Sequence, residues 1–171
     1  MSVHVFEHPS IYSKNNSLQY NFAMKFLSHL TFDSNSRVLD IGCGDGLITS
    51  EIAQIVKEGC VIGTDVSSNM IDFASKKYLS HNNLRFIQMD VTKNFFREQF
   101  DVVTSFNCLH WVEDQRKAFR NILRSAVSGA LIGVLLSHKK SIYHEVLDSI
   151  CSKKKWEEYF KSSKIPRYFN S

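Results

Sequence analysis

The order of apolar and polar positions divides the chain into short strands and longer helices. Five runs are almost wholly apolar, at residues 37–41, 60–66, 84–91, 100–107 and 129–137. Helical periodicity lies between them, over residues 46–57, 67–79 and 115–127. Strands that alternate with helices predict βαβ units, and continuous apolar strands indicate a sheet that helices cover on both faces. We therefore expect an α/β fold with a doubly wound, mainly parallel sheet of five strands.

The predicted helices carry apolar stripes that indicate which face each helix buries. Over residues 16–30 the stripe recurs every four positions, at Leu18, Phe22, Phe26 and Leu30. Over residues 115–127 the positions expected to face inward are Ala118, Phe119, Ile122 and Leu123. Ser67 or Ser68 is expected to cap the helix at 67–79, and Asp114 the helix at 115–127.

The length of 171 residues allows one compact domain. We divide the chain into an N-terminal helical segment (1–36), a core (37–136) and a helical tail (137–171). In the tail we expect helices near residues 141–151 and 153–161.

Composition and charge narrow the classes of partner and location. The net charge of +4 is mild, and no basic and aromatic face is evident. The three lysines at 153–155 fit a solvated helix end. We therefore expect no nucleic-acid partner. We find no signal peptide, and the apolar run at 130–136 is far shorter than the roughly 20 residues that cross a bilayer, so we expect no membrane partner. The four cysteines form no CxxC pair, which favours reduced thiols, a cytoplasmic location and no metal site.

The strand at 37–41 runs into a loop with three glycines within five residues, Gly42, Gly44 and Gly46. The loop begins at Asp40 and has the pattern D-x-G-x-G-x-G. A dinucleotide-binding loop needs a further glycine at the position of Leu47. An acid at the strand end suits a cationic amino group better than a phosphate, and glycines let a ligand lie directly against the backbone.

Two more acids end the next two strands. Asp65 ends the second strand, where a carboxylate can accept hydrogen bonds from both hydroxyls of a ribose. Asp90 ends the third strand, where a carboxylate can accept from the exocyclic amine of an adenine. Each acid alone is an ordinary strand-end residue. Their joint placement after consecutive strands is the stronger signal.

These segments, VLDIGCGDG, VIGTDVSSNMIDFA and FIQMDV, resemble the class I S-adenosylmethionine-dependent methyltransferases over residues 37–136. The resemblance implies a Rossmann-like methyltransferase core with S-adenosyl-L-methionine as the cofactor. It also implies that Asp40 and the three glycines hold the methionine part of the cofactor and that Asp65 holds the ribose. The other residues that it places at the cofactor are Val66, Asp90, Val91 and Phe106.

A narrower resemblance is to the arthropod juvenile hormone acid O-methyltransferases. It rests on Tyr12, Asn16, Leu18 and Gln19, and on the segment 108–111, Cys-Leu-His-Trp. It implies that Gln19, Trp111 and, more weakly, His110 orient the carboxylate of a small lipophilic acid, and that residues 1–36 cap the acceptor side. The alternative to a role in acceptor binding is a purely structural one, with Trp111 as a core aromatic residue and Gln19 at a solvated helix position.

Two further features of the sequence and of the reaction agree with methylation of a carboxylate. The segment after the fourth strand is FNCL, without the prolines of enzymes that methylate amino groups of bases. A carboxylate is already ionised at pH 7 and needs no base. The alternatives are quinone-type C- or O-methylation, or a cofactor-binding pseudoenzyme. The family's sheet usually ends with an antiparallel hairpin, which we do not find. We therefore expect that the chain is either C-terminally shortened or covers the edge of its fifth strand with the helices of its tail.

Overall fold

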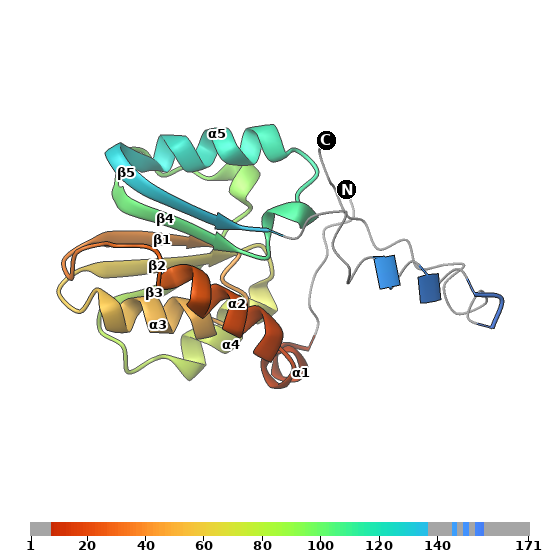
Figure 1. Cartoon of the computed structure of the whole chain (residues 1–171). Helices are drawn as coiled ribbons and strands as arrows, with labels where there is room; N and C mark the ends of the chain where they lie inside the picture. Colours follow the sequence, from red (N-terminus) through yellow and green to blue (C-terminus); the bar gives the residue numbers. More distant parts are fainter. Residues whose placement is uncertain (1–7, 137–144, 147–148, 151–152, 156–171) are drawn as a thin grey trace.

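The computed structural model describes residues 8–136, 145–146, 149–150 and 153–155 of the chain. Its centre is one sheet of five strands in the order β3-β2-β1-β4-β5, and every neighbouring pair is parallel (Figure 1). The strands are β1 (Arg37–Ile41), β2 (Cys60–Asp65), β3 (Leu84–Gln88), β4 (Phe100–Phe106) and β5 (Ala126–Leu135). The prediction of a parallel α/β sheet with five strands is confirmed.

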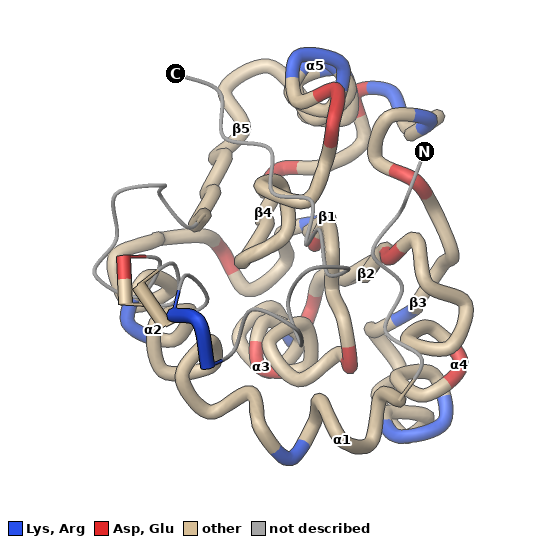
Figure 2. Tube along the Cα trace, turned by 90° about the vertical axis from the view of Figure 1, so that its right-hand side faces the viewer, with Lys and Arg blue, Asp and Glu red and all other residues tan. Residues whose placement is uncertain are grey.

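Helices lie on both faces of the sheet. On one face lie α2 (Ser17–Leu27), α3 (Leu47–Ile55) and α4 (Ser68–Lys77), and on the other lies α5 (Gln115–Ser125) (Figures 1 and 2). The short helix α1 (Pro9–Lys14) lies near the end of the sheet toward which the strands point (Figure 1). Two 3-10 turns, η1 (Val91–Lys93) and η2 (Leu109–Trp111), follow β3 and β4.

Successive residues of the central strands face opposite sides and so build two apolar cores. Val38 of β1 and Val102 of β4 pack with α2 and α3, whereas Leu39 and Val103 pack with α5. All four side chains are at most 2% exposed. This double burial explains why the strands are almost wholly apolar in sequence.

Polar caps begin two of the helices where the sequence predicts them. Ser67 precedes α4 and its hydroxyl accepts a hydrogen bond from the backbone N–H of Met70 at 3.4 Å. Asp114 precedes α5 and its carboxylate accepts from the N–H of Lys117 at 2.9 Å. Each cap satisfies a backbone donor that has no partner within its helix.

The apolar stripe predicted for residues 16–30 is wrong at its N-terminal end. Leu18 and Phe22 are 56% and 57% exposed, and the buried residues of α2 are Ala23 and Leu27. A spacing of four residues drifts by about 40° per step around an α-helix, so such a stripe leaves the buried face within three steps. The helix meets the sheet through small Ala23, while Phe26 packs partly buried against the same core.

The inward face predicted for α5 is half right. Ala118 and Ile122 are buried, but Phe119 is 38% and Leu123 63% exposed. Two polar residues, Asn121 and Ser125, occupy the inner face instead. They can do so because each finds a backbone partner: Asn121 Nδ2 donates to the carbonyl of Val91 at 2.9 Å, and Ser125 Oγ to that of Ile122 at 2.7 Å.

Most of the predicted helical tail, residues 137–171, lies outside the described residues, as do most residues of the two helices expected within it. Among the residues that the structure describes, no helix combines the length and the apolar character that crossing a bilayer requires.

Candidate functional site

The candidate site begins with the loop between β1 and α3, which carries the three glycines. Gly42, Gly44 and Gly46 have φ angles of 75°, 54° and 79°, in the left-handed region that glycine adopts without strain. The backbone N–H groups of Gly42 and Cys43 both donate to the carbonyl of Thr64 in β2, at 2.7 and 2.9 Å. The loop is therefore fixed to the neighbouring strand by its own backbone.

The three glycines meet different surroundings. A methyl group on Gly42 would overlap Sγ and Cβ of Cys108, and one on Gly46 would lie 2.7 Å from Cζ of Phe86. On Gly44 the nearest atom would be Cε1 of Tyr12, at 3.7 Å. Gly42 and Gly46 thus allow close packing within the protein. Gly44 presents bare backbone to open space.

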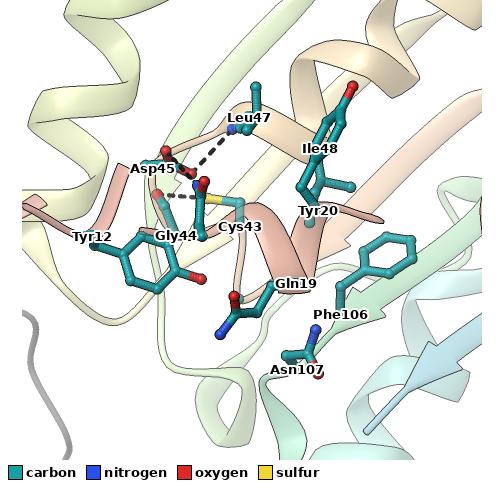
Figure 3. Close-up of a pocket in the computed structure, with 12 residues that line it drawn as sticks. Tyr12, Gln19, Tyr20, Cys43, Gly44, Asp45, Leu47, Ile48, Phe106 and Asn107 are labelled. Atoms are coloured by element: carbon teal, nitrogen blue, oxygen red, sulfur yellow. Dashed lines mark hydrogen bonds between the residues drawn. The ribbon is translucent and has the colours of Figure 1, made fainter. Parts of the chain in front are cut away.

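That open space is a pocket between the glycine loop, the N-terminal helices and the end of β4 (Figure 3). It encloses about 340 Å³ that atoms do not fill, part of it open to solvent. Its lining residues are Tyr12, Asn16, Gln19, Tyr20, Gly42, Cys43, Gly44, Asp45, Leu47, Ile48, Phe106 and Asn107. Four of the predicted site residues therefore meet here: Gln19, Gly42, Gly44 and Phe106.

Phe106 and Gln19 form parts of this lining that differ in character. Phe106 ends β4, is 6% exposed and packs edge-to-face on Phe26 with ring centroids 6.1 Å apart. Gln19 lies on α2, and its Oε1 is buried without a hydrogen-bond partner among the described residues. A buried polar atom without a partner costs free energy, so its presence at a pocket indicates a place where a ligand can bond.

Asp65 lies at the end of β2, next to the glycine loop. Its Oδ2 accepts from the backbone N–H of Gly44 at 3.0 Å, and its Oδ1 from that of Ser67 at 2.9 Å. Burial raises the pKa of Asp65, while these backbone hydrogen bonds act in the opposite direction. Each carboxylate oxygen keeps a second lone pair, so Asp65 can accept from ligand hydroxyls while it holds Gly44 in place.

Asp40 lies inside β1 and is only 2% exposed. Its two carboxylate oxygens accept from the hydroxyls of Thr49, at 2.7 Å, and Thr104, at 2.9 Å. Burial raises the pKa of Asp40 to about 6, against the effect of both hydroxyl bonds. The structure thus places Asp40 beneath the loop, joining β1, α3 and β4, and outside the pocket lining.

The remaining residues predicted for the cofactor lie near the ends of β2 and β3. Asp90 Oδ1 accepts from the N–H and the hydroxyl of Thr92, both at 2.8 Å, and Asp90 is partly exposed. Val91 is 8% exposed and belongs to the core on the α5 side. Val66 follows Asp65, and its carbonyl accepts from Gln88 Nε2 at 3.1 Å. None of these three residues lines the pocket.

The segment after β4 contains two residues that the sequence predicts for the acceptor. His110 is 5% exposed and Trp111 is partly exposed, with ring centroids 5.0 Å apart. Both lie in the turn η2, where the N–H of Trp111 donates to the carbonyl of Cys108 at 2.9 Å. Neither residue lines the pocket, in contrast to Gln19.

The described residues hold no group of three or more His, Cys, Asp or Glu side chains that could bind a metal ion. The acids of the site lie close to one another, but hydroxyl and backbone donors occupy them, as the bonds of Asp40 and Asp65 show.

Comparison with known proteins identifies the family to which this fold and its glycine loop belong. A family model described as "Methyltransferase domain" matches residues 38–129, more than half of the chain, from β1 to the start of β5. The chain belongs to the class I S-adenosylmethionine-dependent methyltransferases.

Two relatives and one solved structure show how far the similarity reaches. "Putative methyltransferase 235L" of invertebrate iridescent virus 6 is 34% identical over 91% of this chain and 57% of its own length. Juvenile hormone acid O-methyltransferase of Drosophila melanogaster is 30% identical over 88% of this chain and 54% of its own length. The chain thus spans little more than half the length of these relatives. A crystal structure of an S-adenosylmethionine-dependent methyltransferase from Aquifex aeolicus shares the fold, with a TM-score of 0.69, 21% identity and coverage of 78% of this chain and 74% of that one.

The residues of this methyltransferase fit the cofactor of its family. Gly44 offers bare backbone at the pocket, and Asp65 offers carboxylate oxygens beside it. Asp90 and Val91 follow the neighbouring strand, where an adenine edge would lie in the predicted arrangement. The pocket in front of Gly44 is lined by neutral polar groups, by the charged Asp45 and by apolar side chains such as Phe106, which suits a ligand with both apolar and polar parts.

Sequence reasoning gave no role to four further residues of the site. Tyr12 faces Gly44 across the pocket, and burial, together with Asp45 and Asp65, raises its pKa to about 12, so the phenol stays protonated. Asn16 Nδ2 donates to Asp45 Oδ2 at 3.1 Å and so ties the start of α2 to the glycine loop. Asn107 follows β4 with a φ of 52°. The signal available in the sequence is the motif that joins Tyr12, Asn16 and Gln19. In the structure Tyr12 lies on α1, Asn16 precedes α2 and Gln19 lies on α2.

Proposed function

We propose that this chain is a methyltransferase that transfers a methyl group from S-adenosylmethionine to the carboxylate of a small lipophilic acid, such as a juvenile hormone acid or farnesoic acid. When bound, the cofactor supplies a methyl group on a sulfonium sulfur; the carboxylate oxygen forms the new bond to that carbon, and the electron pair of the broken bond stays on sulfur. The chain's own residues bind and orient the two partners and exclude water from them.

The observation that carries this proposal is the character of the pocket beside Gly44. Its polar lining away from the loop consists of neutral groups, the amides of Asn16, Gln19 and Asn107 and the phenols of Tyr12 and Tyr20. Figure 3 labels four of these five residues. No Lys, Arg or His is among the twelve lining residues. Neutral donors can orient a carboxylate without forming an ion pair that would lower its nucleophilicity. Phe106 supplies an apolar wall.

Methyl transfer to a carboxylate also asks for little acid–base chemistry. A carboxylate is ionised at pH 7, so no proton has to be removed before it reacts. Alignment of the reacting atoms can supply about 7–11 kcal/mol of the barrier. In this proposal Gln19 orients the carboxylate, and roles for Trp111 and His110 remain predictions. The name of the Drosophila relative supports an acid as the acceptor.

The proposal includes a cytoplasmic location and a small-molecule partner. Three cysteines of the described residues, Cys43, Cys60 and Cys108, are free thiols, which agrees with a reducing compartment.

The test uses the full 171-residue chain in two steps. Calorimetric titration with S-adenosylhomocysteine first measures cofactor binding. Incubation with methyl-labelled S-adenosylmethionine and a panel of fatty and isoprenoid acids then measures transfer, with the matching primary alcohols as acceptors that lack the carboxylate. Alkaline hydrolysis must release the label as methanol, because an ester is cleaved whereas methyl groups on carbon or nitrogen are retained.

The outcomes separate the candidate functions. Binding together with alkali-labile product from acids and none from alcohols supports the proposal. Binding without any product would show a cofactor-binding protein that is not an enzyme for these acids. Absence of binding would overturn both.

A further inference from the structure

Asn107, which the sequence did not predict as a site residue, combines an unusual backbone conformation with a side chain that is unpaired among the described residues. It directly follows β4 and has a φ of 52°, a left-handed conformation that few non-glycine residues adopt. Its backbone N–H donates to the carbonyl of Leu135 at 2.7 Å, which fixes this conformation against the end of β5. Such backbone geometry persists where the surrounding structure imposes it, and it occurs often at ligand sites.

The side chain of Asn107 supplies the second observation. Its Nδ2 is buried and has no hydrogen-bond partner among the described residues. Buried donors in native proteins are almost always bonded, so we expect this one to have a partner that the described residues do not supply. Asn107 lines the pocket, and Figure 3 shows its amide nitrogen directed into the space between Phe106 and Gln19.

Gln19 lines the same pocket from α2, and Figure 3 shows the end of its amide turned away from Asn107. Its Oε1 is likewise buried without a partner among the described residues. The oxygen and nitrogen of a side-chain amide are assigned from their hydrogen bonds, so an amide without bonds can turn either end toward a ligand. Gln19 and Asn107 can therefore each present one N–H donor, from α2 and from the end of β4, to a single ligand group.

The charges around the pocket limit which ligand group Gln19 and Asn107 can bind. Asp45 is the charged residue among the twelve that line the pocket, and its Oδ2 already accepts from Asn16 at 3.1 Å and lies 3.9 Å from Lys77 Nζ. An acceptor with two oxygens on one carbon matches two amide donors.

We propose that Asn107 is an acceptor-binding residue, whose Nδ2 donates to one oxygen of the acceptor carboxylate while the Gln19 amide donates to the other. This inference rests on the proposed function and deepens it. A carboxylate can accept from both N–H groups at once, whereas an amine would require the amides to turn their oxygens toward it. The left-handed backbone of Asn107 is the means by which the donor reaches the pocket.

The test substitutes the donor and leaves the shape unchanged. Asn107→Asp replaces Nδ2 with a carboxylate oxygen, which repels an acid and attracts an amine. We expect at least a tenfold loss of kcat/KM for the best acid of the panel, chiefly through a higher KM, with the dissociation constant of S-adenosylhomocysteine unchanged within about twofold. Calorimetric titration of that acid into protein saturated with S-adenosylhomocysteine should show binding to the wild type and none to Asn107→Asp.

Two variants control for the backbone. Asn107→Gly keeps the left-handed conformation and removes only the amide, so it should also weaken acid binding. Glu98→Gly relieves a φ of 45° at an exposed residue that does not line the pocket, and it should change neither binding constant.

Three results would overturn the inference without overturning the binding of an acid by the chain, and a fourth would overturn both proposals. Equal acid binding and turnover by the wild type and Asn107→Asp would show that Asn107 is only a turn residue. A weaker S-adenosylhomocysteine affinity with an unchanged KM for the acid would place Asn107 at the cofactor. Preferential turnover of amines by the wild type would make it an acceptor for nitrogen. If the wild type itself neither binds nor esterifies any acid, the proposed function fails, and this inference fails with it.

Discussion

The two walls of the pocket are built in different ways. The inner wall is the glycine loop, which backbone hydrogen bonds fix to β2 and which Asp65 holds at Gly44. The outer wall consists of α1 and α2, which are joined to the core by the apolar contacts of α2 and by a few side-chain bonds. These bonds include Asn16 to Asp45, Tyr20 to Glu51 and Lys77 to Ser13, each at 3.1 Å.

Exposure shows the same contrast. The strand that precedes the glycine loop is buried from its second residue to its last, whereas α1 has no buried residue and α2 has two. Ile11, Leu18 and Phe22 are all more than half exposed. Segments with few buried contacts open at lower free-energy cost than the core of a domain. We therefore expect the inner wall to fix the cofactor and the outer wall to open for ligand exchange.

The largest expected effect is on the inner wall, at Gly42. Gly42→Ala places a methyl group on Sγ and Cβ of Cys108 and forces a side chain into a φ of 75°. Overpacking costs about 1–3 kcal/mol, and left-handed strain about 1–2 kcal/mol more. We expect urea denaturation to show a loss of about 2–5 kcal/mol in the free energy of unfolding.

Gly44→Ala is the matched control for this prediction. Its φ of 54° brings the same kind of strain, but the nearest atom to the new methyl group lies 3.7 Å away. We expect a stability loss of only about 1–2 kcal/mol, with weaker S-adenosylhomocysteine binding because the methyl group faces the pocket. Equal stability losses in both variants would show that contact with Cys108 has no energetic consequence.

The next effect concerns Asp40, beneath the loop. Burial raises its pKa to about 6, so between about pH 4 and 6 the folded protein binds this proton more tightly than the unfolded chain does. Ionisation of Asp40 therefore lowers stability as pH rises through this window. A shift of about two pKa units corresponds to about 3 kcal/mol at pH 7. Asp40→Asn, which mimics the protonated form, should remove that loss.

Urea denaturation of both proteins between pH 4 and 7 measures this effect. The stability of Asp40→Asn relative to the wild type should rise with pH by up to about 3 kcal/mol. Asp65 is present in both proteins, and its charge contributes to the raised pKa of Asp40, so the difference includes the repulsion between the two carboxylates. A difference that stays constant with pH would mean that the Thr49 and Thr104 hydroxyls fully compensate the burial of the carboxylate.

The inner wall is also the part that the sequence predicts well, for a physical reason. In a parallel sheet the carboxyl ends of all strands meet at one edge, so acids and glycines that follow consecutive strands must come together. Local pattern alone therefore places Gly44 and Asp65 side by side, as the hydrogen bond between them shows. The parallel sheet of five strands and the caps at Ser67 and Asp114 are likewise predicted from local patterns.

The outer wall is poorly predicted because its contacts are long-range. Asn16 meets Asp45 across 29 residues, and no local rule pairs an amide with a particular carboxylate. The face of α2 that is buried depends on the sheet beneath it, which is why Leu18 and Phe22 were assigned to the wrong side. Asn107 carries no turn signature in its FNCL context, and its left-handed φ depends on the end of β5.

A smaller effect tests whether Asp65 belongs to the cofactor site. Asp65→Ala should weaken S-adenosylhomocysteine binding by about 1.5–3 kcal/mol, the range of hydrogen bonds to charged groups. This corresponds to a dissociation constant raised about tenfold to a hundredfold in calorimetric titration. Asp72→Ala, at an exposed position of α4, is the control and should bind as the wild type does. An unchanged affinity in Asp65→Ala would remove this carboxylate from the site.

The smallest expected effect lies on the outer wall, at Asn16. Asn16 is 8% exposed, and its bond to Asp45 Oδ2 is the link between the start of α2 and the glycine loop. Asn16→Ala should cost about 1 kcal/mol, the usual net value of one hydrogen bond. Because the outer wall opens separately from the core, the loss should appear as faster amide exchange over residues 9–27, with little change in exchange over β1 and β4.

Asn15→Ala is the control for this prediction, because it removes a neighbouring amide whose hydrogen bond is made to α1 and not to the glycine loop. Asn15 is exposed and its Nδ2 donates to the carbonyl of Ile11 at 2.8 Å, so its loss should change stability by less than about 0.5 kcal/mol. Stopped-flow release of S-adenosylhomocysteine should be faster in Asn16→Ala than in Asn15→Ala if the outer wall closes the pocket. Equal release rates, or exchange that rises equally in the sheet, would mean that both walls open as one unit and would remove the contrast between them.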